Sequence, residues 1–238
     1  LLNKGMTVQQ AVSAYSQQSR VLFAEPDYYL VSSAIPSDPR FNEQWALANT
    51  GQSGGKTGAD IGARSAWDVS TGTTKMIVSV MDTGVDYTHP DLYQNIWINQ
   101  GEIPASRRSN LIDVDGDGLI TFRDLNDKRN QGVGKIMDLN GNGYIDAGDI
   151  LKPMSKNSNG SDNGNGGWAN GVSDNKDQWI DDLIGWNFAN NTNNPMDDFG
   201  HGTHVAGILG ATGSNGQGVT GINWAIQIMP IKFMTGTG

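Results

Sequence analysis

Apolar residues recur along this chain in short runs that are separated by long polar, glycine-rich stretches. Three of the runs have the length of buried strands and cover residues 76–81, 180–188 and 225–234. A fourth begins at Val205 and contains small residues, which predicts a closely packed helix starting near His201. Gly207 and Gly210 each destabilise a helix by about 1 kcal/mol relative to alanine. We therefore expect both glycines at points where this helix passes close to another backbone. Alternating strands and helices predict an α/β fold with a doubly wound, mainly parallel sheet.

Weaker local patterns complete the predicted secondary structure. They predict a helix over 7–15, two extended segments within 20–31 and a short helix over 66–69. Pro230 predicts a bulge or an irregular start in the last strand. The Asn-, Gly- and Ser-rich residues 156–177 predict a mobile loop.

Two residues with complementary chemistry stand at the ends of these predicted elements. Asp82 directly follows the strand over 76–81, and open parallel sheets place their chemistry at the carboxyl ends of strands. His201 stands at the start of the predicted helix. A lone histidine there is more often structural, but an aspartate can orient an imidazole and stabilise it once it has taken a proton. Asp82 and His201 are therefore the candidate catalytic residues.

The sequences around these residues carry a family resemblance. Residues 80–85 (VMDTGV) and 201–207 (HGTHVAG) resemble the Asp and His signatures of the subtilisin-like serine proteases, or subtilases, in the family's chain order. The resemblance implies a serine-type endopeptidase with an Asp-His-Ser triad that acts on protein or peptide substrates. It implies Asp82 as the orienting acid, His201 as the general base, and His204 as a structural residue packed under the helix.

The same resemblance implies what surrounds the catalytic pair. No Gly-Thr-Ser-Met-Ala-like segment and no oxyanion-binding Asn of the family occur before Gly238, so we expect a precursor fragment that is inactive alone. Residues 21–31 resemble the end of a subtilase propeptide. We therefore expect residues 1–34 to be the C-terminal part of an intramolecular inhibitor, and 35–238 to be the N-terminal portion of the peptidase domain.

An insertion over residues 109–177 interrupts the pattern of the main domain. It contains two loops with oxygen ligands at EF-hand positions, a glycine at position 6 and an isoleucine at position 8 of each. Position 12 is Asp rather than Glu, as in dockerin-like loops, which predicts weak, extracellular-grade calcium affinity. A single loop of this kind could be an acidic turn, but the repeat favours Ca²⁺. The predicted ligands, with position 7 acting through its carbonyl, are Asp113, Asp115, Asp117, Leu119 and Asp124, and Asp138, Asn140, Asn142, Tyr144 and Asp149.

A third calcium site follows from the family resemblance alone. The Gly-rich turn over 213–221 corresponds to a loop that helps to hold a structural calcium in subtilases. The resemblance implies Asp91 and Asn215 as ligands, with Asp38 as a further candidate. The turn is only a weak candidate for a phosphate-binding loop, because no strand of the nucleotide-binding kind precedes it.

Composition narrows the function further. A net charge of −9 argues against nucleic acid or an anionic membrane surface as the main partner. No run of about 18 apolar residues is present, so we expect no membrane span. Three histidines and no His-Glu-x-x-His segment argue against a zinc hydrolase. Two classes remain: a secreted or cell-surface, calcium-dependent serine endopeptidase, and a non-catalytic calcium-binding scaffold or interaction module.

Overall fold

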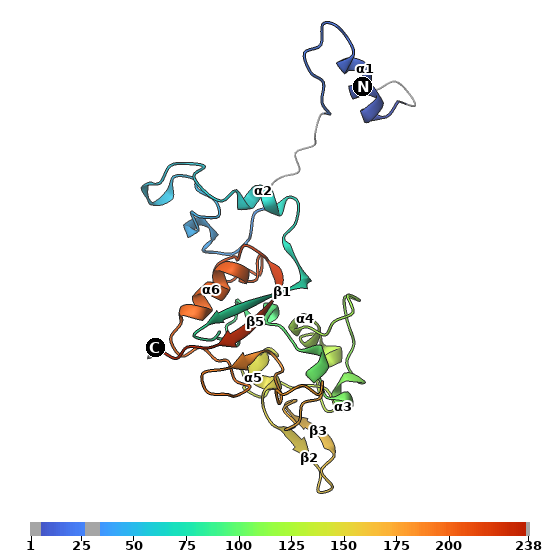
Figure 1. The fold of residues 1–238 in the computed structure, drawn as a ribbon, viewed down its shortest axis with the longest axis vertical. Helices are drawn as coiled ribbons and strands as arrows, with labels where there is room; N and C mark the ends of the chain where they lie inside the picture. Colours follow the sequence, from blue (N-terminus) through green and yellow to red (C-terminus); the bar gives the residue numbers. More distant parts are fainter. Residues whose placement is uncertain (1–5, 27–33, 237–238) are drawn as a thin grey trace. The chain divides into compact units, whose positions relative to one another are not determined.

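A computed structural model describes residues 6–26 and 34–236 of the chain, which forms two compact units, residues 1–33 and 34–238. In the first unit, helix α1 (Val8–Ser16) begins with a capping box in which Thr7 and Gln10 bond reciprocally. The helix predicted over 7–15 is thus confirmed (Figure 1). Residues 20–26 form no strand, because the described part of this unit offers no partner strand. The extended segment predicted at 27–31 lies outside the described residues.

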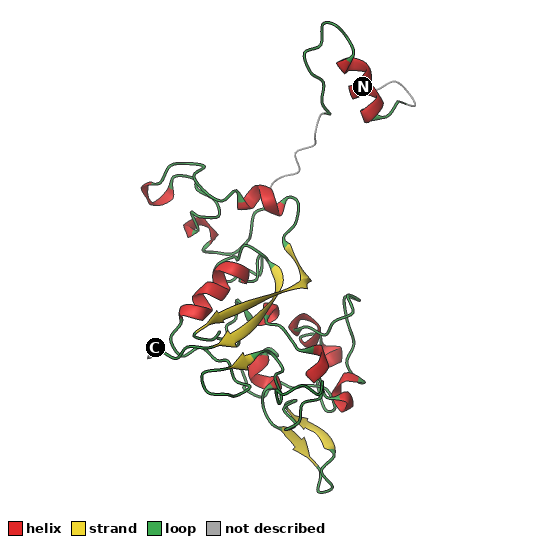
Figure 2. Cartoon of the chain, viewed as in Figure 1, coloured by secondary structure: helices red, strands yellow, loops and turns green. Residues whose placement is uncertain are grey.

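The second unit is built on a parallel sheet of three strands. Its spatial order is β1 (Gly72–Asp82), β5 (Ala225–Lys232) and β4 (Trp186–Asn187), and β5 pairs in parallel with both neighbours. Helix α6 (His201–Gly210) packs against β1 and β5 (Figures 1 and 2). The predicted α/β fold with a mainly parallel sheet is confirmed.

Two strand predictions need correction. The strand predicted over 180–188 is reduced to β4, because Asp181 instead turns the chain by accepting the amides of Asn170 and Gly171. Pro230 causes no bulge: β1 and β5 keep one register beside it, and their irregularity lies between Gly72 and Ile77.

Short helices and one hairpin are the other regular elements in the described part of the second unit, and long loops and turns connect them. The helix predicted over 66–69 forms slightly earlier. The elements are α2 (Ala63–Trp67), α3 (Ala105–Arg108), α4 (Phe122–Leu125), α5 (Ala147–Ile150), the 3-10 turns η1 (Phe41–Glu43), η2 (Gln52–Gly54), η3 (Tyr93–Asn95), η4 (Gln100–Glu102) and η5 (Lys128–Asn130), and the strands β2 (Met154–Lys156) and β3 (Asp162–Gly166).

The segment predicted as a mobile loop, 156–177, is instead anchored. Its first half closes the antiparallel β2–β3 hairpin. Arg107, fully buried, forms an ion pair with Asp162 at 2.7 Å and donates to the backbone carbonyls of Gly164 and Asn165. A guanidinium offers five donors in a fixed fork, so one arginine orders this glycine-rich turn where no apolar side chain is available.

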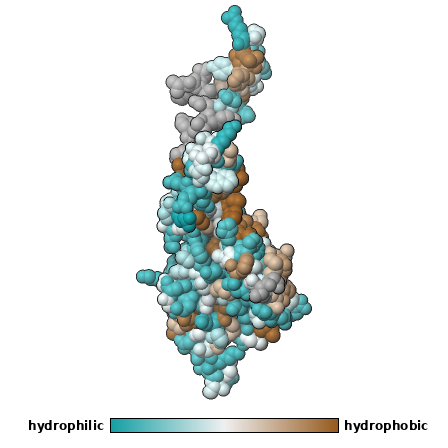
Figure 3. Space-filling view, turned by 90° about the vertical axis from the view of Figure 1, so that its left-hand side faces the viewer, coloured by the Kyte–Doolittle hydropathy of each residue, from teal (hydrophilic) through white to brown (hydrophobic). Residues whose placement is uncertain are grey.

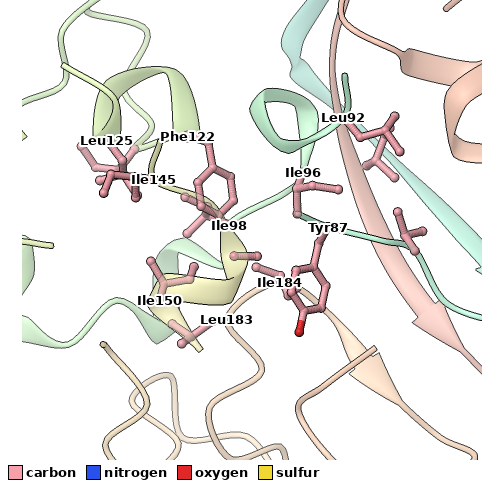
Figure 4. Packing of buried hydrophobic residues seen from close by; sticks show 14 of the residues in the cluster. Tyr87, Leu92, Ile96, Ile98, Phe122, Leu125, Ile145, Ile150, Leu183 and Ile184 are labelled. Atoms are coloured by element: carbon pink, nitrogen blue, oxygen red, sulfur yellow. The ribbon is translucent and has the colours of Figure 1, made fainter. Parts of the chain in front are cut away.

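The insertion shares one hydrophobic core with the sheet. Figure 4 shows Phe122, Leu125 and Ile145 of the insertion beside Ile96 and Ile98 of the main domain. All five side chains are at most 1% exposed. Removing this apolar surface from water ties the insertion to the domain as firmly as any other part of it.

The face of the second unit that Figure 3 shows is mostly polar, with hydrophobic patches between the polar regions. Some of the exposed apolar area belongs to β1, where Met76, Ile77 and Met81 are about half exposed or more while Val80 is buried. The run 76–81 therefore forms the predicted strand but is not covered on both faces. None of the helices in the described residues combines the length and the apolar character needed to cross a bilayer.

Candidate active site

The structure brings Asp82 and His201 into direct contact. Asp82 is the last residue of β1, and His201 is the first residue of α6. The Nδ1 atom of His201 lies 2.8 Å from each carboxylate oxygen of Asp82. The His201 side chain is 60% exposed, whereas that of Asp82 is 11% exposed. The buried carboxylate thus occupies one ring nitrogen and leaves Nε2 as the free nitrogen of an accessible imidazole.

The charge state of Asp82 fixes which nitrogen carries the proton. Burial raises the pKa of this carboxyl, but the Thr83 amide and His201 together outweigh burial, and the pKa lies below its ordinary value. An ionised carboxylate only accepts hydrogen bonds, so the His201 Nδ1 must donate. The neutral imidazole therefore carries its lone pair on Nε2, which is the form a general base requires.

Asp197 holds the start of α6 against the end of β1. Its carboxylate accepts the amides of Phe199, Gly200 and Thr203 and the hydroxyls of Thr203 and Thr83. Burial opposes ionisation, but these five donors hold the pKa of Asp197 far below its usual range. Sequence analysis gave Asp197 no role. An acid within one turn before a helix start was the available signal, because carboxylates accept the unpaired amides there.

Glycines allow the end of β1 and the start of α6 to approach closely. A Cβ on Gly202 would lie 2.0 Å from the carbonyl oxygen of Gly84, so only glycine fits. Gly84 itself has φ of +105°, which strongly favours glycine. A Cβ on Gly221 would lie 2.6 Å from the Gly210 Cα, so Gly210 passes close to another backbone as predicted, but a Cβ on Gly207 would contact nothing within 4 Å. The prediction for Gly207 was therefore wrong, and Gly202 makes the closest backbone contact.

His204 is not packed under the helix as expected. It is exposed and lines a surface cavity of about 520 Å³ together with His89 and Asp91. The reason is helical geometry: Gly202 and Ala206, four residues apart, face the sheet, so His204 between them points elsewhere.

A buried lysine also supports the site. Lys232, at the end of β5, is 2% exposed, donates to the Thr83 carbonyl and pairs with Asp198 at 2.7 Å. Its contact with Thr83 fixes the residue that follows Asp82. A single lysine in the apolar run 225–234 was the sequence signal for this role, and we assigned it none.

The first predicted calcium loop gathers its acidic side chains. Oxygen atoms of Asp113, Asp115 and Asp117 lie within 4.8 Å of one another. Burial and the neighbouring carboxylates Asp117 and Asp124 raise the pKa of Asp115, as expected for acids crowded without a cation. Asp124 caps the loop, accepting the amides of Val114 and Thr121. Hard oxygen donors in this spacing fit Ca²⁺.

The second loop repeats the hydrogen bonds of the first. Asp138 accepts the amides of Gly141 and Gly143, as Asp113 accepts those of Gly116 and Gly118. In the same way the side chain at position 12, Asp149, accepts the amides of residues 139 and 146. The side-chain amides of Asn140 and Asn142 donate to the Asp146 carboxylate. The hydroxyl of Tyr144 donates to the Thr88 carbonyl at 2.7 Å, in the segment that follows β1.

The third predicted ligand set is also brought together. Asp91 and Asp38 are 3% and 4% exposed, and both bond to the turn 214–219. Asn215 donates its side-chain amide to Asp91 at 2.7 Å. Burial and the charge of Asp38 raise the pKa of Asp91. Two buried carboxylates with an amide group beside them offer the hard oxygen donors that Ca²⁺ requires.

Comparison of the sequence with known protein families finds a match to one family model. The model of the subtilase family of peptidases matches residues 73–238, which includes β1, α6 and the insertion.

Individual relatives agree with this match. The chain is 29% identical over 163 residues to subtilisin-like protease 1 of Plasmodium berghei, covering 68% of this chain and 16% of that protein. It is 26% identical over 234 residues to the cell wall-associated protease of Bacillus subtilis, covering 97% and 16%. The chain thus spans about a sixth of the length of these two relatives. A solved protease of Pseudoalteromonas arctica PAMC 21717 has 25% identity and a TM-score of 0.37, covering 86% of this chain and 40% of the other.

The Asp197 network predicts a specific dependence of stability on pH. Because its folded-state pKa lies below the unfolded value of about 4, the stability it contributes is complete at neutral pH and is lost as pH falls below about 4. We expect Asp197→Asn to lower the free energy of unfolding at pH 7 by about 1 kcal/mol or more. The difference from wild type should shrink at pH 2. Urea unfolding at pH 7, 4 and 2 measures it.

The matched control is Asp68→Asn, since Asp68 is exposed and accepts the amide of Ala34, far from α6 in the sequence. It should change stability by less than about 0.5 kcal/mol. A wild-type-like unfolding curve for Asp197→Asn at pH 7 would remove the network from this account.

Proposed function

The chain belongs to the subtilase family, and from this premise we propose that it carries the acid and the base of a serine-type endopeptidase. The observation that supports the proposal most strongly is the contact of His201 Nδ1 with the buried Asp82 carboxylate, which leaves Nε2 accessible. A non-catalytic scaffold has no need for this pair. The pair therefore favours catalysis over the scaffold alternative.

In the proposed reaction His201 transfers a proton in two steps. Its Nε2 takes the proton from a serine hydroxyl as the oxygen attacks a peptide carbonyl, and then gives it to the leaving amine. Among residues 6–26 and 34–236 no serine is hydrogen-bonded to His201. We propose that the nucleophile comes from sequence outside residues 1–238. The substrates are proteins or peptides.

Asp82 acts in this scheme through His201. It keeps the proton on Nδ1, so that Nε2 is the basic nitrogen, and it stabilises the imidazolium that forms when His201 is protonated. Asp197 and Lys232 are positioning residues: Asp197 bonds to Thr83 and to Thr203 of α6, and Lys232 bonds to Thr83 and Asp198.

We assign the unit ending at Ser33 to a propeptide that inhibits the enzyme intramolecularly, with the peptidase portion following it. The boundary between the two compact units supports this division. We also place the protein outside the cell or at its surface. The name of the Bacillus subtilis relative, a cell wall-associated protease, agrees with that location.

Ca²⁺ is the cofactor that we propose for the three oxygen-rich sites described above. Bound there, it would neutralise crowded carboxylates and hold loops whose acids otherwise repel one another. The first loop bonds to the catalytic strand through Thr74, whose hydroxyl donates to Asp117 at 2.6 Å. The second loop contacts Thr88 through Tyr144. Both contacts support a structural role, in which the loops are tied to β1 and to the segment that follows it.

The proposed role of Asp82 predicts a large loss of activity from a single substitution. In the complete protein, Asp82→Asn should lower kcat for peptide hydrolysis about 10⁴-fold with little change in KM, because the amide selects the wrong imidazole tautomer. Steady-state kinetics on a peptide substrate and circular dichroism measure activity and fold. Asp68→Asn, the exposed control, should retain full kcat. Wild-type activity in a folded Asp82→Asn enzyme would sink the assignment.

The calcium assignment predicts that a chelator loosens the insertion. We expect an added protease to cleave within residues 109–150 in EDTA and much more slowly in excess Ca²⁺, with His201→Ala used to prevent self-cleavage. Mass spectrometry of the fragments locates the cuts. Asp113→Asn should be cleaved in Ca²⁺ as well, whereas Asp127→Asn, an acid between the two loops, should remain protected. Cleavage that is the same in EDTA and Ca²⁺ counts against the assignment.

A further inference from the structure

Two tryptophans line a cavity at β4. The cavity has a volume of about 400 Å³, which is within the range of small-molecule binding sites. The rings of Trp179 and Trp186 have centroids 4.9 Å apart and planes tilted by 50°, and Phe188 packs edge-on against Trp179 at 5.2 Å. The polar residues that line the cavity are Gln178, Asp181, Asn191, Thr192 and Asn193. The cavity thus combines aromatic surface with amide and hydroxyl groups.

Trp186 carries a buried donor that has no acceptor. The residue is 9% exposed, and its indole Nε1 atom has no hydrogen-bond partner within residues 6–26 and 34–236. Buried indole N–H groups usually find an acceptor, because burying one without a hydrogen bond is costly. Since Trp186 lines the cavity, an oxygen atom bound there would supply the acceptor.

Other polar groups of the wall are also available to a ligand. No other residue that the structure describes is hydrogen-bonded to the side chains of Gln178, Asn191, Thr192 or Asn193. Water can satisfy the exposed ones, but Asn193 is half-buried. Amide and hydroxyl side chains both donate and accept hydrogen bonds. The wall therefore suits a ligand whose own polar groups do both.

The walls of the cavity are held in place by backbone hydrogen bonds. On one side, the amides of Asn187 and Thr192 each donate to the other residue's carbonyl, at 2.9 and 3.1 Å. On the other side, Asp177 accepts the Trp179 amide at 2.6 Å, and Asp181 accepts two backbone amides. A site formed in advance loses little conformational freedom when a ligand binds, which favours affinity.

Charge and backbone pairing narrow the class of ligand. Within the described residues no lysine or arginine lines the cavity, and Asp181 is acidic, so phosphate, sulfate and carboxylate ligands are disfavoured. A peptide strand cannot add beside Asn187, because Thr192 already occupies the amide and carbonyl of that residue. A proline-rich peptide offers carbonyl acceptors but no N–H donors for the amide oxygens. The hydroxyl groups of a sugar both donate and accept, and its C–H groups pack on aromatic rings.

We propose that the cavity lined by Trp179, Trp186 and residues 191–193 binds a neutral saccharide. A sugar ring packs on the Trp179 indole, an oxygen of the sugar accepts from Trp186 Nε1, and the amides of the wall bond to its hydroxyl groups. The site shares no residue with the Asp82–His201 pair or with the three predicted calcium sites. The inference therefore does not depend on the proposed protease function.

Binding measurements with defined sugars test the proposal. The complete protein carrying His201→Ala, which prevents self-cleavage, is titrated calorimetrically with maltotriose, cellotriose and triacetylchitotriose, and with trigalacturonate as an anionic comparison. At least one neutral trisaccharide should bind, and trigalacturonate should bind at least about tenfold more weakly. Trp179→Ala should weaken the binding of the neutral sugar at least about tenfold. Trp45→Ala is the matched control and should bind like the parent protein, since Trp45 is an exposed tryptophan outside the cavity.

Asn193→Ala provides a second variant in case Trp179→Ala does not fold. It should weaken binding of the neutral sugar about fivefold, with an unchanged circular dichroism spectrum, because it removes no hydrogen bond within the described residues. Decaproline tests the peptide alternative and should not compete with the sugar. The proposal is overturned if none of the three neutral sugars binds at millimolar concentration, or if decaproline binds in their place. Unchanged affinity in folded Trp179→Ala or folded Asn193→Ala overturns it as well.

Discussion

The contact between the end of β1 and the start of α6 is the constraint on which the rest of this structure depends. The imidazole of His201 can reach the carboxylate of Asp82 only if the first residue of α6 lies next to the last residue of β1. Gly202 against Gly84 removes the side chains that would prevent this, and Asp197 links the two segments through Thr83 and Thr203. The same arrangement buries Asp82 but keeps it ionised, since the Thr83 amide and His201 compensate for lost hydration.

The insertion supports the contact between β1 and α6 indirectly, through the core and through β1. Its apolar side chains join the core beneath the sheet, and its loops contact Thr74 and Thr88 on either side of Asp82 along the chain. Its acids are crowded and partly buried, and the proposed Ca²⁺ would neutralise them. If the proposal holds, cation binding and the stability of β1 are physically connected in this molecule.

Sequence alone located the features that follow from local pattern. The strand ending at Asp82, the helix starting at His201 and the parallel sheet could be read from apolar periodicity and from where the polar residues interrupt it. The features it missed depend on contacts between distant segments. Nothing local tells that Asp197 accepts a hydroxyl from Thr83 or that Lys232 is buried against Thr83.

The wrong predictions have the same origin. Residues 156–177 read as mobile because their composition is poor in apolar side chains, whereas Arg107, 55 positions before Asp162, bonds to the hairpin and helps to order it. His204 was placed under the helix by resemblance, whereas helical geometry directs Gly202 and Ala206 to the sheet. The exposed faces of Met76 and Met81 could not be inferred either, because an apolar run does not say which of its side chains will be covered.

The most direct test of the central claim is nuclear magnetic resonance of the His201 ring in a chain carrying ¹⁵N-labelled histidine. The account predicts that the neutral form of the ring carries its proton on Nδ1, with that proton shifted strongly downfield by the Asp82 carboxylate, and loss of the signal in Asp82→Asn. The signals of His89 and His204 should not change with the substitution. A His201 ring protonated on Nε2, or one that does not respond to Asp82→Asn, would contradict the account.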